Sequence, residues 1–189
     1  RGAIPVFIDI REDTLNIDEG LIERAITQKT KAIVVVHYGG VSCEMDHILS
    51  IAQKSKIPII EDAAQGIMAH YNGHALGSMG DLGCISFHDT KNIIAGEGGA
   101  LLINNPKYIE RAEVIRDKGT NRKKFMRGEI DKYTWVDQGS SYVPSELISA
   151  FLFAQLQKAE FITEMRVKIW KTYHKEFENL EKNEVLVRP

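Results

Sequence analysis

AIVVVHY (residues 32–38) and IPIIED (residues 57–62) are the two stretches that decide the fold. Each is a short and nearly continuous apolar run, which is the pattern of a strand buried on both faces of a parallel sheet. Between them, residues 45–54 place apolar side chains at helical spacing. A strand, a helix and a second strand in this order predict a layered α/β fold, with a mostly parallel sheet and helices on both faces.

The same alternation extends in both directions along the chain. Upstream, IPVFIDI (4–10) predicts a strand, and Asn16 or Asp18 is a candidate N-cap for the helix that follows it. Downstream, CISFH (84–88) predicts a buried strand, and ALLIN (100–104) predicts another strand after a glycine-rich turn. We therefore expect the α/β pattern to continue through more than half of the chain.

The last part of the chain changes character. Asn105 is a candidate cap for a helix that begins at Pro106 and ends near Gly119. Residues 120–143 are polar, aromatic and irregular, which predicts a long loop, and loops of that length inside compact domains usually serve a function. Apolar residues then recur at helical period over residues 144–182, which predicts two consecutive helices.

The composition excludes several classes of protein. With 43% hydrophobic and 26% charged residues, the sequence is that of a globular protein and not of a disordered or fibrous one. The 24 basic and 26 acidic residues are mixed along the chain, so we expect neither nucleic acid nor an anionic membrane as a partner. No apolar run approaches the roughly 20 residues that span a bilayer, and no basic and apolar leader opens the chain. We therefore expect a cytoplasmic protein that acts on small molecules.

The cysteines and the chain ends support two further expectations. Cys43 and Cys84 lie far apart without CxxC or histidine-rich spacing, which predicts buried free thiols and argues against a disulfide or a zinc site. The chain starts at Arg1, inside an apolar run that is already in progress. We therefore expect it to be a fragment of a longer chain.

Polar side chains gather where the predicted strands end, which is where ligands bind in open α/β sheets. They are Glu61, Asp62, Gln65, Ser86, His88 and Lys91. Taken singly, an aspartate at a strand end is more often a cap, and a lysine in a loop is more often a solvated charge. GEGG (96–99) taken alone is equally weak evidence for a functional site, because glycine clusters usually only shape turns. The order of these groups along the chain is stronger evidence for a particular site than any one of them.

EDAAQ (61–65), SFHDTKN (86–92) and GEGG in this order resemble the pyridoxal phosphate (PLP) dependent sugar aminotransferases of the DegT/DnrJ/EryC1/StrS family. The resemblance extends over essentially all 189 residues. Within the family, KGTNR (118–122) and DKYTW (131–135) are most similar to the branch that makes dTDP-4-amino-4,6-dideoxygalactose.

The resemblance implies the fold and the domain boundaries. The fold would be the three-layer fold type I of PLP-dependent transferases, which is that of aspartate aminotransferase. Residues 1–143 would then be part of the PLP-binding large domain. Residues 144–189 would be a helical connection toward a smaller C-terminal domain that is truncated here.

The resemblance also assigns roles to the candidate site residues. Lys91 would carry PLP as a Schiff base and shuttle a proton, and the Asp62 carboxylate would keep the ring nitrogen protonated. Gln65 would lie beside the phenolic oxygen of the cofactor, and Ser86 would bind its phosphate. His88 is either a cofactor contact or a packed histidine at the strand end.

The implied reaction moves an amino group from L-glutamate, which leaves as 2-oxoglutarate, to C4 of dTDP-4-keto-6-deoxy-D-glucose during surface-polysaccharide synthesis. Lys91 speaks against the dehydratase branch of the family, which carries histidine at this position. The full-length protein would be a homodimer. Two alternatives stay open: another nucleotide ketosugar as the acceptor, and an inactive folded fragment that lacks a complete cofactor site.

Three features lie outside this pattern. Many family members place an asparagine that reaches the partner's phosphate near the position of Val143, so the resemblance does not extend to that contact. A phosphate cradle at GEGG is disfavoured, because this turn leads into a strand and not into a helix N-terminus. The basic run at residues 122–124 is interpreted as a solvated face, with a phosphate or sugar-nucleotide contact as the alternative.

Overall fold

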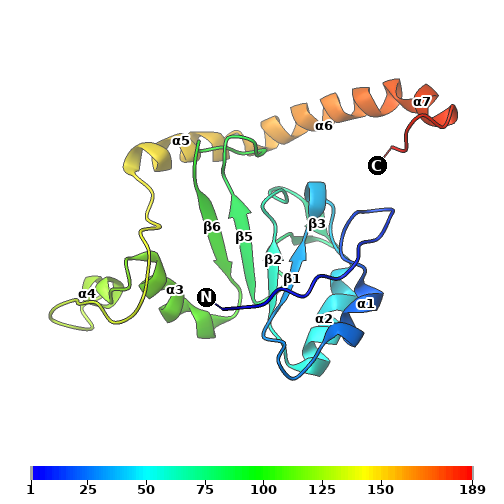
Figure 1. Cartoon of the computed structure of the whole chain (residues 1–189). Helices are drawn as coiled ribbons and strands as arrows, with labels where there is room; N and C mark the ends of the chain where they lie inside the picture. Colours follow the sequence, from blue (N-terminus) through cyan, green and yellow to red (C-terminus); the bar gives the residue numbers. More distant parts are fainter. Residues whose placement is uncertain (1, 189) are drawn as a thin grey trace.

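The main sheet has four strands in the order β1–β2–β5–β6 (Figure 1) in the computed structural model, which describes residues 2–188. They are β1 (Ile33–Val36), β2 (Ile59–Asp62), β5 (Leu82–Ser86) and β6 (Gly99–Ile103). The first three run parallel, and β6 pairs antiparallel with β5. The predicted mostly parallel sheet is therefore confirmed.

The helices account for much of the remaining chain. They are α1 (Glu19–Ala25), α2 (Met45–Ser55), α3 (Ile109–Arg116), α4 (Arg122–Met126), α5 (Glu146–Leu156), α6 (Ala159–Glu176) and α7 (Glu178–Lys182). Two short 3₁₀ turns, η1 (Tyr38–Gly40) and η2 (Pro106–Tyr108), and a small hairpin of β3 (His70–Tyr71) and β4 (His74–Ala75) complete the described elements. No helix within residues 2–188 combines the length and the apolar character needed to cross a bilayer.

The first core lies between β1, β2 and the two N-terminal helices. Ile33 and Val35 alternate with exposed neighbours along β1, and the sheet register places Ile59 of β2 on the same face as Ile33. Ile22 of α1 and Ile48 of α2 pack onto this face, and both are buried. The helical spacing seen in the sequence therefore marks the side of α2 that covers the sheet.

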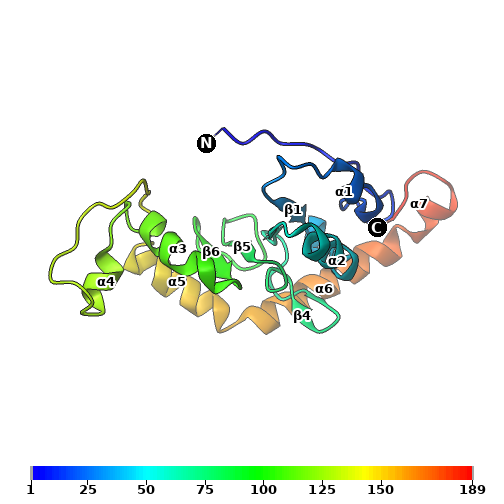
Figure 2. The ribbon, with the colours of Figure 1, turned by 90° about the horizontal axis from the view of Figure 1, so that it is seen from below.

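The second core lies on the same face of the sheet, further along it. The register pairs Glu61 with Gly83 and Ile85 with Ala100, so these side chains share the face that α2 covers. Ile85 and Ala100 pack with residues of α5 and α6 around the buried Ile93. Seen along the strands, α5 and α6 (yellow to orange) run along one side of the sheet (Figure 2).

The opposite face of the sheet is open in the described part of the chain. Val34 and Val36 of β1 are 55% and 46% exposed, and Leu101 of β6 is 49% exposed. The prediction that the 32–38 strand is buried on both faces was therefore wrong. The α/β fold class is confirmed, but the helices in the two cores cover one face only.

The predicted strand over residues 4–10 is absent. Within the described chain this segment makes only one isolated bridge, between Ile10 and Ile17, and Phe7 is 91% exposed. The segment has the β-branched composition of a strand, but it pairs with no strand of the two described sheets. Side-chain preference alone does not make a strand without such an edge.

Most helix boundaries agree with the caps seen in the sequence. Of the two candidate caps of α1, Asp18 is the N-cap, because its side chain accepts a hydrogen bond from Gly20 N. Asn105 caps the turn η2, which leads into α3. Residues 144–182 form the two predicted helices and the short α7, whereas the predicted loop 120–143 contains the helix α4. The division of the chain at residue 143 stays a prediction.

The two cysteines are both free thiols. Cys43 is buried, and burial raises the pKa of its thiol to about 11. Cys84 on β5 is only partly buried, so the prediction of a buried thiol holds for Cys43 alone. A thiol with a raised pKa carries little thiolate near neutral pH and is a poor nucleophile.

Candidate active site

A cavity of about 250 Å³ lies at the carboxyl ends of the parallel strands. Its lining residues are Val36, His37, Tyr38, Asp62, Ala64, Gln65 and Lys91. They come from three segments: the end of β1, the turn after β2 and the loop after β5. The fold thus brings three of the five predicted site residues, Asp62, Gln65 and Lys91, to one cavity. Ser86 and His88 are not among its lining residues.

Asp62 is the last residue of β2 and is partly buried. Its Oδ1 atom accepts a hydrogen bond from Ala64 N at 3.0 Å, which is the local turn contact expected of an aspartate at a strand end. Val36 is its cross-strand partner on the open face of the sheet. The same carboxylate therefore shapes the turn and contributes to the cavity wall.

Gln65 follows in the same turn, and its amide has a defined orientation. The side-chain Oε1 accepts a hydrogen bond from Gly39 N at 2.7 Å. A backbone N–H can only donate, so the atom that faces it must be the oxygen of the amide. Gln65 therefore has its Nε2 group, a hydrogen-bond donor, to offer to a ligand in the cavity.

Lys91 is held by a loop that folds back on the glycine-rich segment. Its backbone N donates to His88 O at 3.0 Å, and Asp89 N donates to Gly96 O at 3.0 Å. Gly96 and Gly98 have φ angles of +80° and +152°, which side chains rarely adopt. The GEGG segment thus closes the loop that presents Lys91, before β6 begins at Gly99.

Ser86 and His88 make contacts within this loop. Ser86 Oγ accepts a hydrogen bond from His88 N at 3.3 Å. The ring nitrogens of His88 face Thr90 Oγ1 at 2.9 Å, Asp89 Oδ1 at 2.8 Å and Glu97 Oε1 at 3.8 Å. The side chain of His88 is 42% exposed. Of the two interpretations of His88, the packed histidine at the strand end therefore does not apply.

The sequence interpretation missed the role of Glu61. This fully buried carboxylate accepts hydrogen bonds from the backbone N atoms of Gly77, Met79 and Gly80, and it contacts His37 of the cavity wall. Burial alone would raise the pKa of Glu61, but the hydrogen bonds from His37 and the three backbone groups outweigh it and lower the pKa. An acidic residue that continues the apolar run of a buried strand, one position before Asp62, was the signal that could have indicated it.

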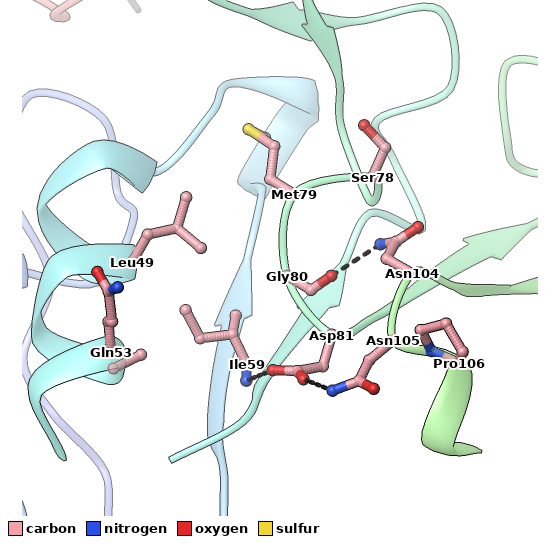
Figure 3. A pocket seen from close by; sticks show the side chains of 11 residues that line it. Leu49, Gln53, Ile59, Ser78, Met79, Gly80, Asp81, Asn104, Asn105 and Pro106 are labelled. Carbon is pink, nitrogen blue, oxygen red and sulfur yellow. Dashed lines mark hydrogen bonds between the residues drawn. The ribbon is translucent and has the colours of Figure 1, made fainter. Parts of the chain in front are cut away.

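A larger hollow of about 550 Å³ lies at the other end of the sheet, where β2 and β5 begin (Figure 3). There Asp81 accepts hydrogen bonds from Ile59 N and from Asn105 Nδ2, and Asn104 Nδ2 donates to Gly80 O (Figure 3). These polar groups bind one another and join the start of β2 to the turns that flank β5 and β6. The hollow is accordingly a structural junction.

The basic residues 122–124 lie on α4 and do not reach the cavity. Lys124 pairs with Glu110 of α3, and Arg122 lies 3.8 Å from Asp117. The side chain of Arg122 is 49% exposed. These contacts agree with the interpretation of a solvated face, although on a helix and not in a loop.

The sheet with its helices is similar to solved aminotransferases, including a PLP-form, which places the chain in the fold type I class of PLP-dependent transferases. The chain belongs to the DegT/DnrJ/EryC1/StrS aminotransferase family, whose sequence pattern matches residues 1–189. The predicted family is confirmed.

Individual relatives agree with this assignment. The chain is 37% identical over 180 residues to the UDP-4-amino-4,6-dideoxy-N-acetyl-beta-L-altrosamine transaminase of Campylobacter jejuni, covering 94% of this chain and 46% of that protein. PseC of Helicobacter pylori, an aminotransferase involved in the biosynthesis of pseudoaminic acid, has a TM-score of 0.85 at 30% identity, with 94% and 46% covered. The PLP-form of Spr1654 from Streptococcus pneumoniae gives 0.82 at 26% identity, with 93% and 48% covered. The chain spans about half the length of these relatives.

Proposed function

We propose that this chain forms part of the cofactor site of a PLP-dependent nucleotide-sugar aminotransferase, with Lys91 as the residue that binds the cofactor covalently. The observation that carries the proposal is the shared cavity of Lys91, Asp62 and Gln65. The chemistry of these groups fits PLP: an amine for its aldehyde, a carboxylate for its ring nitrogen and an amide donor for its phenolic oxygen. The Spr1654 structure in its PLP-form supports the same cofactor.

PLP supplies an electron sink that stabilises negative charge on the carbon it activates. Asp62 would favour the protonated state of the ring nitrogen, because an opposite charge close by raises the pKa of such a nitrogen. The Gln65 Nε2 group would donate to an oxygen that carries negative charge. The Lys91 amine would serve as the group that takes up and returns a proton at the substrate carbon. Ser86 and His88 remain proposed cofactor contacts, Ser86 toward the phosphate.

The proposed substrates follow from the family. L-glutamate is the amino donor, and the acceptor is a nucleotide-linked 4-keto-6-deoxyhexose, with dTDP-4-keto-6-deoxy-D-glucose as the preferred candidate. The product is then dTDP-4-amino-4,6-dideoxygalactose. A UDP-linked ketosugar is the alternative, and the name of the Campylobacter jejuni relative favours it. A homodimer in the cytoplasm is the proposed setting of the whole protein.

Cofactor attachment can be tested directly. The chain mixed with PLP is expected to develop a visible absorbance band, and borohydride should fix the cofactor to the peptide that contains Lys91. Lys91→Ala should remove the band, whereas Lys54→Ala, at an exposed position on α2, should leave it unchanged. A chain that folds but gives no band would support the inactive alternative.

The substrate can be tested separately. The whole protein would be assayed with L-glutamate and a panel of dTDP-4-ketosugars and UDP-4-ketosugars, and 2-oxoglutarate would be measured. Turnover with the dTDP-linked sugar is the expected result. Turnover with UDP-linked sugars alone would overturn the dTDP assignment and leave the aminotransferase assignment intact.

A further inference from the structure

Asn16 is a buried asparagine, 2% exposed, that holds both ends of one loop of the candidate site. Its Oδ1 atom accepts a hydrogen bond from Tyr38 N at 2.9 Å. Its Nδ2 group donates to Val41 O at 3.0 Å. A single side chain from the segment before α1 thereby fixes the loop that follows β1, with its amide oxygen at one end of the loop and its amide nitrogen at the other.

The loop between these two contacts lies against Gln65. Gly39 N donates to Gln65 Oε1 at 2.7 Å. Gly39 and Gly40 have φ angles of +63° and +81°, and a Cβ atom on Gly40 would come within 2.9 Å of the Gln65 carbonyl oxygen. The close approach to Gln65 requires glycine at position 40, whereas a Cβ atom on Gly39 would meet open space and only its positive φ favours glycine there.

The hydrogen bond from Gly39 decides which end of the Gln65 amide is left to bind a ligand. Gln65 is exposed, so its side chain would otherwise sample several rotamers and both amide orientations. With Oε1 held by Gly39, the Nε2 donor is the group left for a ligand. An oxygen that carries negative charge is the partner that such a donor prefers.

We infer that Asn16 is a positioning residue of the candidate cofactor site: through the loop 38–41 it keeps Gln65 turned so that the cavity receives a hydrogen-bond donor. The inference rests on the proposed function only where the ligand is taken to be PLP, whose phenolic oxygen would accept from this donor. The link from Asn16 to Gln65 is a property of the chain without any cofactor.

His37 holds the same loop through two further hydrogen bonds, so the effect of losing Asn16 can be told apart from unfolding of the whole loop. Cys43 N donates to His37 Nδ1 at 3.2 Å, and Gly40 N donates to His37 O at 3.1 Å. The bond from Gly40 N to His37 O closes the turn around Gly39, whereas Asn16 holds Tyr38 N before this turn and Val41 O after it. Loss of Asn16 should therefore loosen both ends of the turn and weaken the Gly39 contact, while the His37 bonds keep the turn itself folded.

The first experiment uses the chain without cofactor. In Asn16→Ala both loop contacts are lost, and the Gly39 amide should exchange its hydrogen with solvent about tenfold faster, the effect of one lost hydrogen bond. Asn16→Asp keeps the acceptor for Tyr38 N but sets a buried carboxylate oxygen against Val41 O, so it should release the Val41 end of the loop and also speed the exchange of the Gly39 amide. The matched control is Asn105→Ala, because Asn105 also makes two hydrogen bonds, to Asp81 and Lys107, but at the other end of the sheet. Unchanged Gly39 exchange in Asn16 variants with a native circular dichroism spectrum would overturn the inference.

The second experiment adds PLP and follows the pH midpoint of the visible band. Loss of the donor to the phenolic oxygen should favour the protonated form of the lysine-bound cofactor, so the midpoint should rise in both Asn16 variants and stay constant in Asn105→Ala. Faster Gly39 exchange with an unmoved midpoint would reject the effect on the cofactor. If no variant and no unmodified chain gives a band, the proposed function fails, and the exchange rates alone decide the inference.

Discussion

His37 Nε2 lies 2.9 Å from Glu61 Oε2, and both side chains are completely buried. The backbone N of Cys43 donates to His37 Nδ1, so that nitrogen has no proton and Nε2 carries one. His37 is therefore a neutral donor to an ionised Glu61. This pair connects the ends of β1 and β2 one residue before Asp62, on the face opposite to that of Asp62 itself.

Glu61→Gln is expected to destabilise the fold by about 2–4 kcal/mol, because an amide NH₂ would face backbone N–H groups that now bind a carboxylate oxygen. Urea unfolding at neutral pH measures the change. Glu12→Gln, at an exposed position, serves as the control and should change stability by less than about 0.5 kcal/mol. Equal unfolding midpoints for the two variants would contradict the structural role of Glu61.

The stability of the chain should also fall in acid. The folded state lowers the pKa of Glu61 below its ordinary value of 4.5, so this contribution to stability is complete above pH 4.5 and is lost as the pH falls through the folded pKa. The urea midpoint, measured between pH 6 and pH 3, should decrease less steeply in Glu61→Gln than in Glu12→Gln. An identical slope in both variants would show that Glu61 keeps its ordinary pKa.

Gly83→Ala is expected to destabilise the chain by more than about 3 kcal/mol. A Cβ atom at this position would lie 2.0 Å from the Gly77 carbonyl oxygen, because the 77–80 loop crosses β5 there to reach Glu61. Gly73→Ala meets open space and has only the strain of its φ angle of +84°, about 1–2 kcal/mol. Thermal unfolding of the two variants measures the loss of stability in each. A smaller loss for Gly83→Ala than for Gly73→Ala would contradict the close approach of Gly77 to β5.

The sequence predicted those parts of the molecule that depend on local pattern. The strands β2 and β6 and the helix α2 have apolar periodicity of their own, and Asp62, Gln65 and Lys91 meet because the carboxyl ends of parallel strands share one edge. The segment 4–10 has the same composition as a strand but depends on a partner edge that its own sequence cannot specify. The Asn16 and Glu61 contacts join segments more than 15 residues apart, and no spacing rule predicts such pairs.

Gln65→Glu tests the orientation of the Gln65 side chain without disturbing the loop. One carboxylate oxygen can still accept from Gly39 N, so the fold should lose less than about 0.5 kcal/mol, as at other exposed positions. The second oxygen replaces a donor by a negative charge that faces the cavity. The pH midpoint of the PLP band should therefore rise by about one unit, because a nearby negative charge favours the protonated cofactor. Gln138→Glu, also exposed but outside the cavity lining, is the control and should leave the midpoint unchanged. An unmoved midpoint in Gln65→Glu would mean that the Nε2 group does not face the cofactor oxygen.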